Sequence, residues 1–109
     1  MKLLLKGIPA SVGKVSGKAR VISLSKESNK LEFGEILVVK ITDAQMFVDI
    51  MTKAKGLVTD LGGVTSHPAI VSRELGIPCV VATQKATNII KTGMKIVVDG
   101  EKGEVYESD

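Results

Sequence analysis

The sequence predicts a single α/β domain with a central sheet, short helices and a second, smaller layer of strands. Its 109 residues match the usual length of one domain. In the middle of the chain, apolar β-branched segments alternate with amphipathic ones, which is typical of strands joined by helices. At both ends, strand-like segments follow one another directly. This arrangement favours antiparallel pairing there and argues against a plain doubly wound fold.

The first third of the chain contains three expected strands, over 3–8, 17–23 and 36–40. Turn-forming residues at 9–13 separate the first two strands. The third is a continuous apolar, β-branched run, which predicts a strand covered on both faces. The polar and unpatterned stretch 23–34 predicts a loop between the second and third strands.

Helices and strands then alternate. Thr42 and Gln45 have the spacing of a capping box, and the apolar stripe that follows predicts a helix over 43–55. A short buried strand is expected over 56–60, followed by a loop over 62–67. The remaining elements are a helix over 68–75 that starts on Pro68, a strand over 77–83, a short helix over 84–91 and a closing hairpin over 94–107.

Composition excludes several classes of function. The net charge is +3, and the lysines are scattered singly along the chain, which is typical of a solvated surface rather than a nucleic-acid interface. Aromatic residues make up only 3% of the chain, too few for a base-stacking platform. With one Cys and one His, the chain has neither a disulfide nor a Cys or His-pair metal site, so no metal is expected. Cys79 lies in a strand pattern and is expected in the core.

Nothing in the sequence indicates a membrane. The apolar run at 3–5 is cut by Lys6 and is too short for a signal peptide. No segment approaches the roughly 20 apolar residues that a membrane span needs. We therefore expect a cytoplasmic protein with neither a membrane nor a nucleic acid as partner.

A glycine pair, two hydroxyls and the chain's one histidine stand between a predicted buried strand and a predicted helix. They are Gly62, Gly63, Thr65, Ser66 and His67. Loops at the carboxyl ends of strands bind ligands in open α/β sheets. A helix start offers unpaired N–H groups and partial positive charge to an anion such as phosphate. Glycines allow close approach of the backbone, and the hydroxyls add donors.

A neutral imidazole at this place can act as a nucleophile toward a phosphoryl donor. The phosphoramidate formed would bring about two negative charges to the helix start, which stabilises them. Position alone leaves the role of His67 open, since a histidine at a helix start is also typical of a surface or capping residue. Arg73 is either a phosphate clamp or a solvated side chain. Asp60 either orients the imidazole or is a polar strand-end residue.

Residues 59–83, TDLGGVTSHPAIVSRELGIPCVVAT, resemble the phosphohistidine domain of the phosphoenolpyruvate-utilising enzymes, which is also called the swivelling or mobile domain. That family includes phosphoenolpyruvate synthase, pyruvate phosphate dikinase and enzyme I of the sugar phosphotransferase system. Its motif is GGxTSH or GGxTCH, followed by a small-residue helix, an Arg and G-I-P. Segments 7–21 and 97–106 resemble the opening and close of the same domain, so 1–109 would be one mobile domain. Pro68 departs from the family's usual Ala.

The resemblance implies a layered β/β/α fold and a role for each motif residue. His67 would be the phosphohistidine. The phosphoryl group would be bound by Gly62, Gly63, Thr65, Ser66 and Arg73. Thr65 matches a regulatory phosphorylation position of some pyruvate phosphate dikinases, although the same regulation is not assumed for this chain.

The implied function is phosphoryl transfer between two active sites, on the ATP side and the phosphoenolpyruvate side. Family enzymes carry an ATP-grasp domain and a phosphoenolpyruvate-binding barrel, and this chain contains neither. The expected partners are therefore an ATP-grasp nucleotide-binding subunit and a phosphoenolpyruvate- or pyruvate-binding barrel subunit. Mg, ATP and phosphoenolpyruvate would bind there, with no cofactor on this chain. The chain would then be a free-standing carrier or a fragment.

Two alternatives stay open. The first is a non-catalytic anion-binding or regulatory module that keeps the fold. The second is a swivelling domain of the aconitase type, against which the GGVTSH segment at 62–67 argues.

Overall fold

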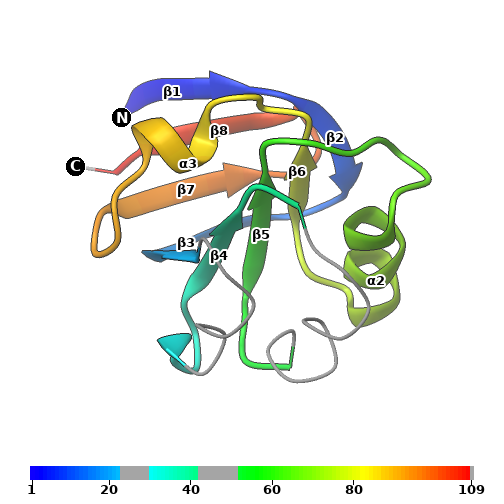
Figure 1. The fold of residues 1–109 in the computed structure, drawn as a ribbon, viewed down its shortest axis with the longest axis horizontal. Coiled ribbons are helices and arrows are strands. Elements are labelled where there is room, and N and C mark those ends of the chain that lie inside the picture. Colours follow the sequence, from blue (N-terminus) through cyan, green and yellow to red (C-terminus); the bar gives the residue numbers. More distant parts are fainter. Residues whose placement is uncertain (23–29, 42–51, 109) are drawn as a thin grey trace.

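The computed structural model describes residues 1–22, 30–41 and 52–108. They form strands and two short helices around one mixed sheet (Figure 1). The strands are β1 (Lys2–Lys6), β2 (Ile8–Ser11), β3 (Lys14–Ile22), β4 (Ile36–Val39), β5 (Gly56–Thr59), β6 (Cys79–Val81), β7 (Lys95–Asp99) and β8 (Glu104–Glu107). The helices are α2 (His67–Leu75) and α3 (Ala86–Ile89). Most of the helix expected over 43–55 lies outside the described residues.

The strands follow the order β1-β8-β7-β3-β4-β5-β6-β2 across the sheet. β3, β4, β5 and β6 pair in parallel. β7, β8 and β1 continue from β3 in antiparallel pairing, and β2 pairs antiparallel with β6. A parallel centre with antiparallel strands from the two chain ends confirms the predicted fold class.

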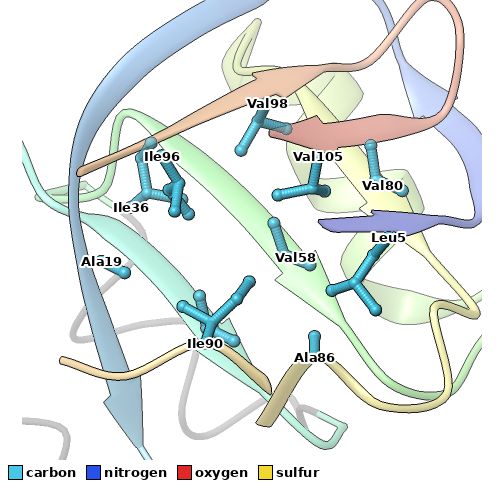
Figure 2. Close-up of a cluster of buried hydrophobic side chains, with 11 residues drawn as sticks. Leu5, Ala19, Ile36, Val58, Val80, Ala86, Ile90, Ile96, Val98 and Val105 are labelled. Atoms are coloured by element: carbon cyan, nitrogen blue, oxygen red, sulfur yellow. The ribbon is translucent and has the colours of Figure 1, made fainter. Parts of the chain in front are cut away.

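Two apolar cores lie on opposite faces of the parallel strands because successive side chains of a strand point to opposite faces. Leu37, Leu57 and Val81 belong to the core that α2 covers, which we call the helix-side core. Ile36, Val58 and Val80 belong to the second, the sheet-side core, with side chains from β1, β7, β8 and α3 (Figure 2). All residues of β4, β5 and β6 are buried, as their continuous apolar sequences predict. The result is the layer order β/β/α.

One continuous segment, residues 2–11, supplies both edge strands of the sheet, β1 at one edge and β2 at the other. The chain changes partner at Gly7, whose N–H donates to the carbonyl of Gly103 at 2.8 Å. The sequence predicted a strand over 3–8 and a turn over 9–13, whereas the structure places β2 over most of that turn. A proline is tolerated in β2 because this is an end strand, where a missing N–H need not break the ladder.

The other helices and strands agree with expectation apart from their bounds. α2 begins at His67, one residue before the predicted start, and ends at Leu75, where Gly76 with its left-handed φ of 72° forms the C-cap. α3 is limited to Ala86–Ile89, because Ile90 is extended. Thr83, three residues before α3, donates its hydroxyl to the carbonyl of Thr59 at 2.9 Å.

Gly7→Ala should destabilise the fold by about 1–3 kcal/mol because overpacking forces the backbone to shift. A Cβ at Gly7 would lie 2.3 Å from the backbone carbonyl oxygen of Val81. Urea unfolding followed by circular dichroism measures the change, with Lys6→Ala as the exposed neighbouring control, expected to stay within about 0.5 kcal/mol. Equal stability of the two variants would contradict the close packing of Gly7 on β6.

The buried thiol of Cys79 should not react with labelling reagents in the folded protein. Its ionisation in the unfolded chain should lower the free energy of unfolding at alkaline pH. Burial raises the pKa of its thiol from 9.0 to about 11. The thiol of the unfolded chain therefore ionises first, so the contribution is complete below pH 9.0 and is lost as pH rises to about 11. Unfolding of the wild type and of Cys79→Val between these pH values, together with thiol labelling at pH 8, tests this. Rapid labelling without unfolding would contradict the burial.

Candidate functional site

The segment that contains the glycine pair leaves the carboxyl end of β5 and leads into α2 (Figure 1). Its first two residues stay attached to the neighbouring strand end. The N–H of Asp60 donates to Val39 O at 3.1 Å, and that of Leu61 donates to Lys40 O at 3.0 Å. The site therefore begins at a fixed edge of the sheet, where α/β proteins place their ligand sites.

A tight turn follows over residues 62–66, which we call the glycine turn. The N–H and hydroxyl of Ser66 both donate to the carbonyl of Gly63, at 3.0 and 2.6 Å. Gly62 has φ +118°, and a Cβ there would lie 3.0 Å from Ser66 Oγ. Gly63 differs, since a Cβ built there would meet no atom within 4 Å. Gly62 is thus required by the backbone, whereas Gly63 leaves open space on the surface of the turn.

His67 is the first residue of α2 and is half-buried. Its Nδ1 atom is buried. The next two residues, Pro68 and Ala69, are buried and hold the first turn of the helix in place. That first turn of α2 contains no acidic residue, so no carboxylate there neutralises the partial positive charge of the helix start.

The two hydroxyl residues of the motif, Thr65 and Ser66, directly precede the first residue of α2. Ser66 is the N-cap, and its carbonyl accepts the N–H of Ile70 at 3.0 Å. Its side chain makes no capping hydrogen bond and points back into the glycine turn instead. Thr65 is exposed. Binding of a phosphoryl group by either hydroxyl stays a prediction.

Arg73 lies in the last turn of α2 and reaches back toward the glycine turn. Its Nε donates to the carbonyl of Ala10 in β2 at 2.7 Å, and its Nη2 donates to the carbonyl of Val64. The guanidinium therefore connects β2 with the turn. Contact between Arg73 and a phosphoryl group stays a prediction.

Asp60 is buried and attached to α3. Its Oδ1 accepts the N–H of Thr87 at 2.9 Å, and its Oδ2 accepts the hydroxyl of the same residue at 2.5 Å. The carboxylate thus supplies acceptors to the first turn of α3, whose own N-cap Lys85 makes no side-chain cap. Orientation of the His67 ring by Asp60 stays a prediction.

Sequence reasoning missed a second loop that supports this one. Ala82 and Gln84, just after β6, have positive φ values of 58° and 71°, which non-glycine residues seldom adopt. The N–H groups of Thr83 and Gln84 donate to the carbonyls of Thr59 and Asp60 at 3.1 and 2.9 Å. The polar sequence TQK at 83–85, one residue after a buried strand, was the available signal, because parallel strands end at the same sheet edge.

Beyond this site, a groove of about 580 Å³ runs beside β2, between Arg73 and the β7–β8 turn.

Within residues 1–22, 30–41 and 52–108, no cluster of three His, Cys, Asp or Glu side chains could hold a metal ion. Across the same ranges, every helix is too short or too polar to cross a membrane.

The two glycines should differ in their effect on stability. Gly62→Ala forces a side chain into a left-handed backbone and against Ser66, which should cost about 1–3 kcal/mol. Gly63→Ala meets open space and should change the free energy of unfolding by less than about 0.5 kcal/mol. Denaturant unfolding of both variants measures this. A larger loss in Gly63→Ala would contradict the geometry of the turn.

The sequence comparisons point to one family. Residues 31–103 match the family model described as "PEP-utilising enzyme, mobile domain". The chain is 56% identical over 106 residues to a probable phosphoenolpyruvate synthase of Archaeoglobus fulgidus, covering 97% of this chain and 14% of the relative. It is 51% identical to the phosphoenolpyruvate synthase of Pyrococcus furiosus, covering 97% of this chain and 13% of that protein. The chain thus spans about one seventh of the length of these relatives.

Solved structures give the same fold. An NMR structure of Enzyme I (nEIt) has a TM-score of 0.66 at 32% identity, covering 74% of this chain and 33% of that one. Aconitase X of Thermococcus kodakaraensis has a TM-score of 0.67 at 21% identity, covering 96% of this chain and 98% of that one, which shows a shared fold alone. With the family model matching β4, β5, β6, β7 and the complete glycine turn, the chain belongs to the family of PEP-utilising enzyme mobile domains.

Proposed function

We propose that this chain is a phosphoryl-carrier domain in which His67 accepts a phosphoryl group at one active site and passes it to another. The observation that carries the proposal is the position of His67. It is the first residue of α2, directly after a turn that closes on itself through Gly63 and Ser66. A nucleophilic nitrogen thus stands where a helix start favours a negatively charged product.

In the first transfer, the lone pair of His67 Nε2 forms a bond to phosphorus. The bond between phosphorus and the oxygen of the donor breaks, and that oxygen keeps the electron pair. The imidazolium then loses its Nδ1 proton to water, and the ring takes a proton back from water when the phosphoryl group leaves. The second transfer reverses these steps toward an acceptor oxygen. Nε2 is favoured because Nδ1 is buried.

Two features of the site favour the phosphorylated form: the partial positive charge at the start of α2 and the open space beside Gly63. About two negative charges arrive at the positive end of α2, an interaction typically worth 0.3–1 kcal/mol at an exposed helix start. Gly63 leaves room on the turn for phosphoryl oxygens. The hydroxyl of Thr65 is a nearby donor, and that of Ser66 would have to leave the carbonyl of Gly63 to become a second one.

The relatives, phosphoenolpyruvate synthases of which this chain matches 13–14%, support a carrier that works between two partner units. We assign the donor side to an ATP-grasp nucleotide-binding unit and the acceptor side to a phosphoenolpyruvate- and pyruvate-binding barrel. Metal ions that bridge nucleotide phosphates would bind there and not on this chain. The carrier itself has to present His67 to each site in turn.

The experiment combines this chain with a phosphoenolpyruvate synthase whose own mobile domain has been deleted, Mg²⁺, and either ATP or phosphoenolpyruvate. Intact mass should rise by one phosphoryl group per chain, and the label should be lost in acid and kept in alkali, as expected of a phosphoramidate. His67→Asn should show no gain, whereas Thr65→Val, which removes a competing hydroxyl acceptor, should keep a label on nitrogen.

Two results would contradict the proposal: an acid-stable label, or a label that persists in His67→Asn. Binding of inorganic phosphate near residues 62–69 with no covalent gain from either donor would favour the non-catalytic anion-binding module. Repeated turnover by this chain without a partner would also overturn the carrier role.

A further inference from the structure

The guanidinium of Arg73 connects two segments that are far apart along the chain. Ala10, which accepts from Nε at 2.7 Å, is 63 residues away in sequence. Val64, which accepts from Nη2, is nine residues away and lies in the glycine turn. A planar guanidinium presents donors in a fixed fork, so two diverging hydrogen bonds fix its position and that of both acceptors.

The tip of the glycine turn is not held by apolar burial. Val64 is 51% exposed and Leu61 is 44% exposed. The bonds from Ser66 to Gly63 close the turn on itself and do not attach it to the rest of the domain. Among the hydrogen bonds of the described residues, the bond from Arg73 to Val64 attaches the tip to α2, and the bond from the same guanidinium to Ala10 continues the link to β2.

The strand at the other end of this link is well fixed. β2 pairs with β6, and the turn between β7 and β8 packs on its far end. The N–H of Gly100 donates to Gly13 O at 2.7 Å, and a Cβ at Gly100 would lie 1.9 Å from Ser11 O. Such contact leaves β2 little freedom to move, so Arg73 ties the glycine turn to a rigid part of the fold.

The geometry points to Arg73 as a positioning residue that holds the glycine turn, and through it His67, in a fixed place relative to β2. This inference rests on the proposed function for its consequence in transfer, but the tie itself is a property of the unphosphorylated chain. It differs from a direct contact with phosphate, in which positive charge alone would matter. A lysine keeps the charge yet cannot form the two diverging bonds.

Two variants separate these roles. Arg73→Gln removes both the charge and the fork, and Arg73→Lys removes the fork alone. The matched control is Arg20→Gln, since Arg20 also forms a forked pair, with Glu35 at 2.9 and 3.0 Å, on β3. Arg73 is exposed, so its replacement leaves no buried cavity, and two-dimensional NMR spectra check that each variant folds.

The first readout is amide hydrogen exchange in the chain alone. Loss of the tie should speed exchange of the Ser66 amide about tenfold in both Arg73 variants, because one hydrogen bond to a charged donor is worth about 1.4 kcal/mol or more. The Leu57 amide, which bonds Pro78 O at 3.0 Å in the sheet, should not change. Arg20→Gln should leave both amides as in the wild type. Unchanged Ser66 exchange in Arg73→Gln would overturn the inference.

The second readout is the rate at which His67 is phosphorylated, measured with the partner enzyme and with phosphoramidate, a small chemical donor. Both Arg73 variants should be slowed several-fold with the partner and should react like the wild type with phosphoramidate. A wild-type rate in Arg73→Lys beside a slow Arg73→Gln would show that charge alone matters and would overturn the positioning role. If the wild type itself takes no phosphoryl group, the proposed function fails, and the exchange data still decide the role of Arg73.

Discussion

Burial of both faces of β4, β5 and β6 is the constraint on which the rest of this structure depends. The three strands are apolar along their whole length and are covered by α2 on one face and by the strands of the chain ends on the other. With both faces closed, polar chemistry can occur only beyond the strand ends. His67 lies after the longest described connection that leaves such an end, between β5 and α2.

The described contacts hold this connection at its base, at its tip and at its helical end. Asp60 anchors the base on α3, Arg73 attaches the tip to β2, and buried Pro68 fixes the start of α2. The imidazole is therefore presented by a locally rigid frame. That property suits a carrier, because an enzyme active site must find the same nitrogen in the same place at each transfer.

Much of this could be predicted from the sequence because local patterns determine it. The apolar runs at 36–40 and 56–60 predict buried strands, and the glycine pair followed by Pro68 predicts a turn and a helix start. The sequence does not reveal which acceptors a side chain will find across the fold. Nothing local indicates that Asp60 meets Thr87, or that Arg73 reaches Ala10, since these contacts join distant segments. Gly62 and Gly63 are identical in the sequence. The structure shows that Gly62 has a positive φ and contacts Ser66, whereas a side chain at Gly63 would meet open space.

The central claim is that Nε2 of His67 carries the phosphoryl group. The most direct measurement is a phosphorus–nitrogen NMR correlation on the chain labelled with ¹⁵N in its one histidine and phosphorylated by its partner enzyme. The account predicts a single phosphorus signal coupled to Nε2, with the uncoupled Nδ1 shift of a neutral ring. A phosphorus signal coupled to no histidine nitrogen, or coupled to Nδ1, would contradict it.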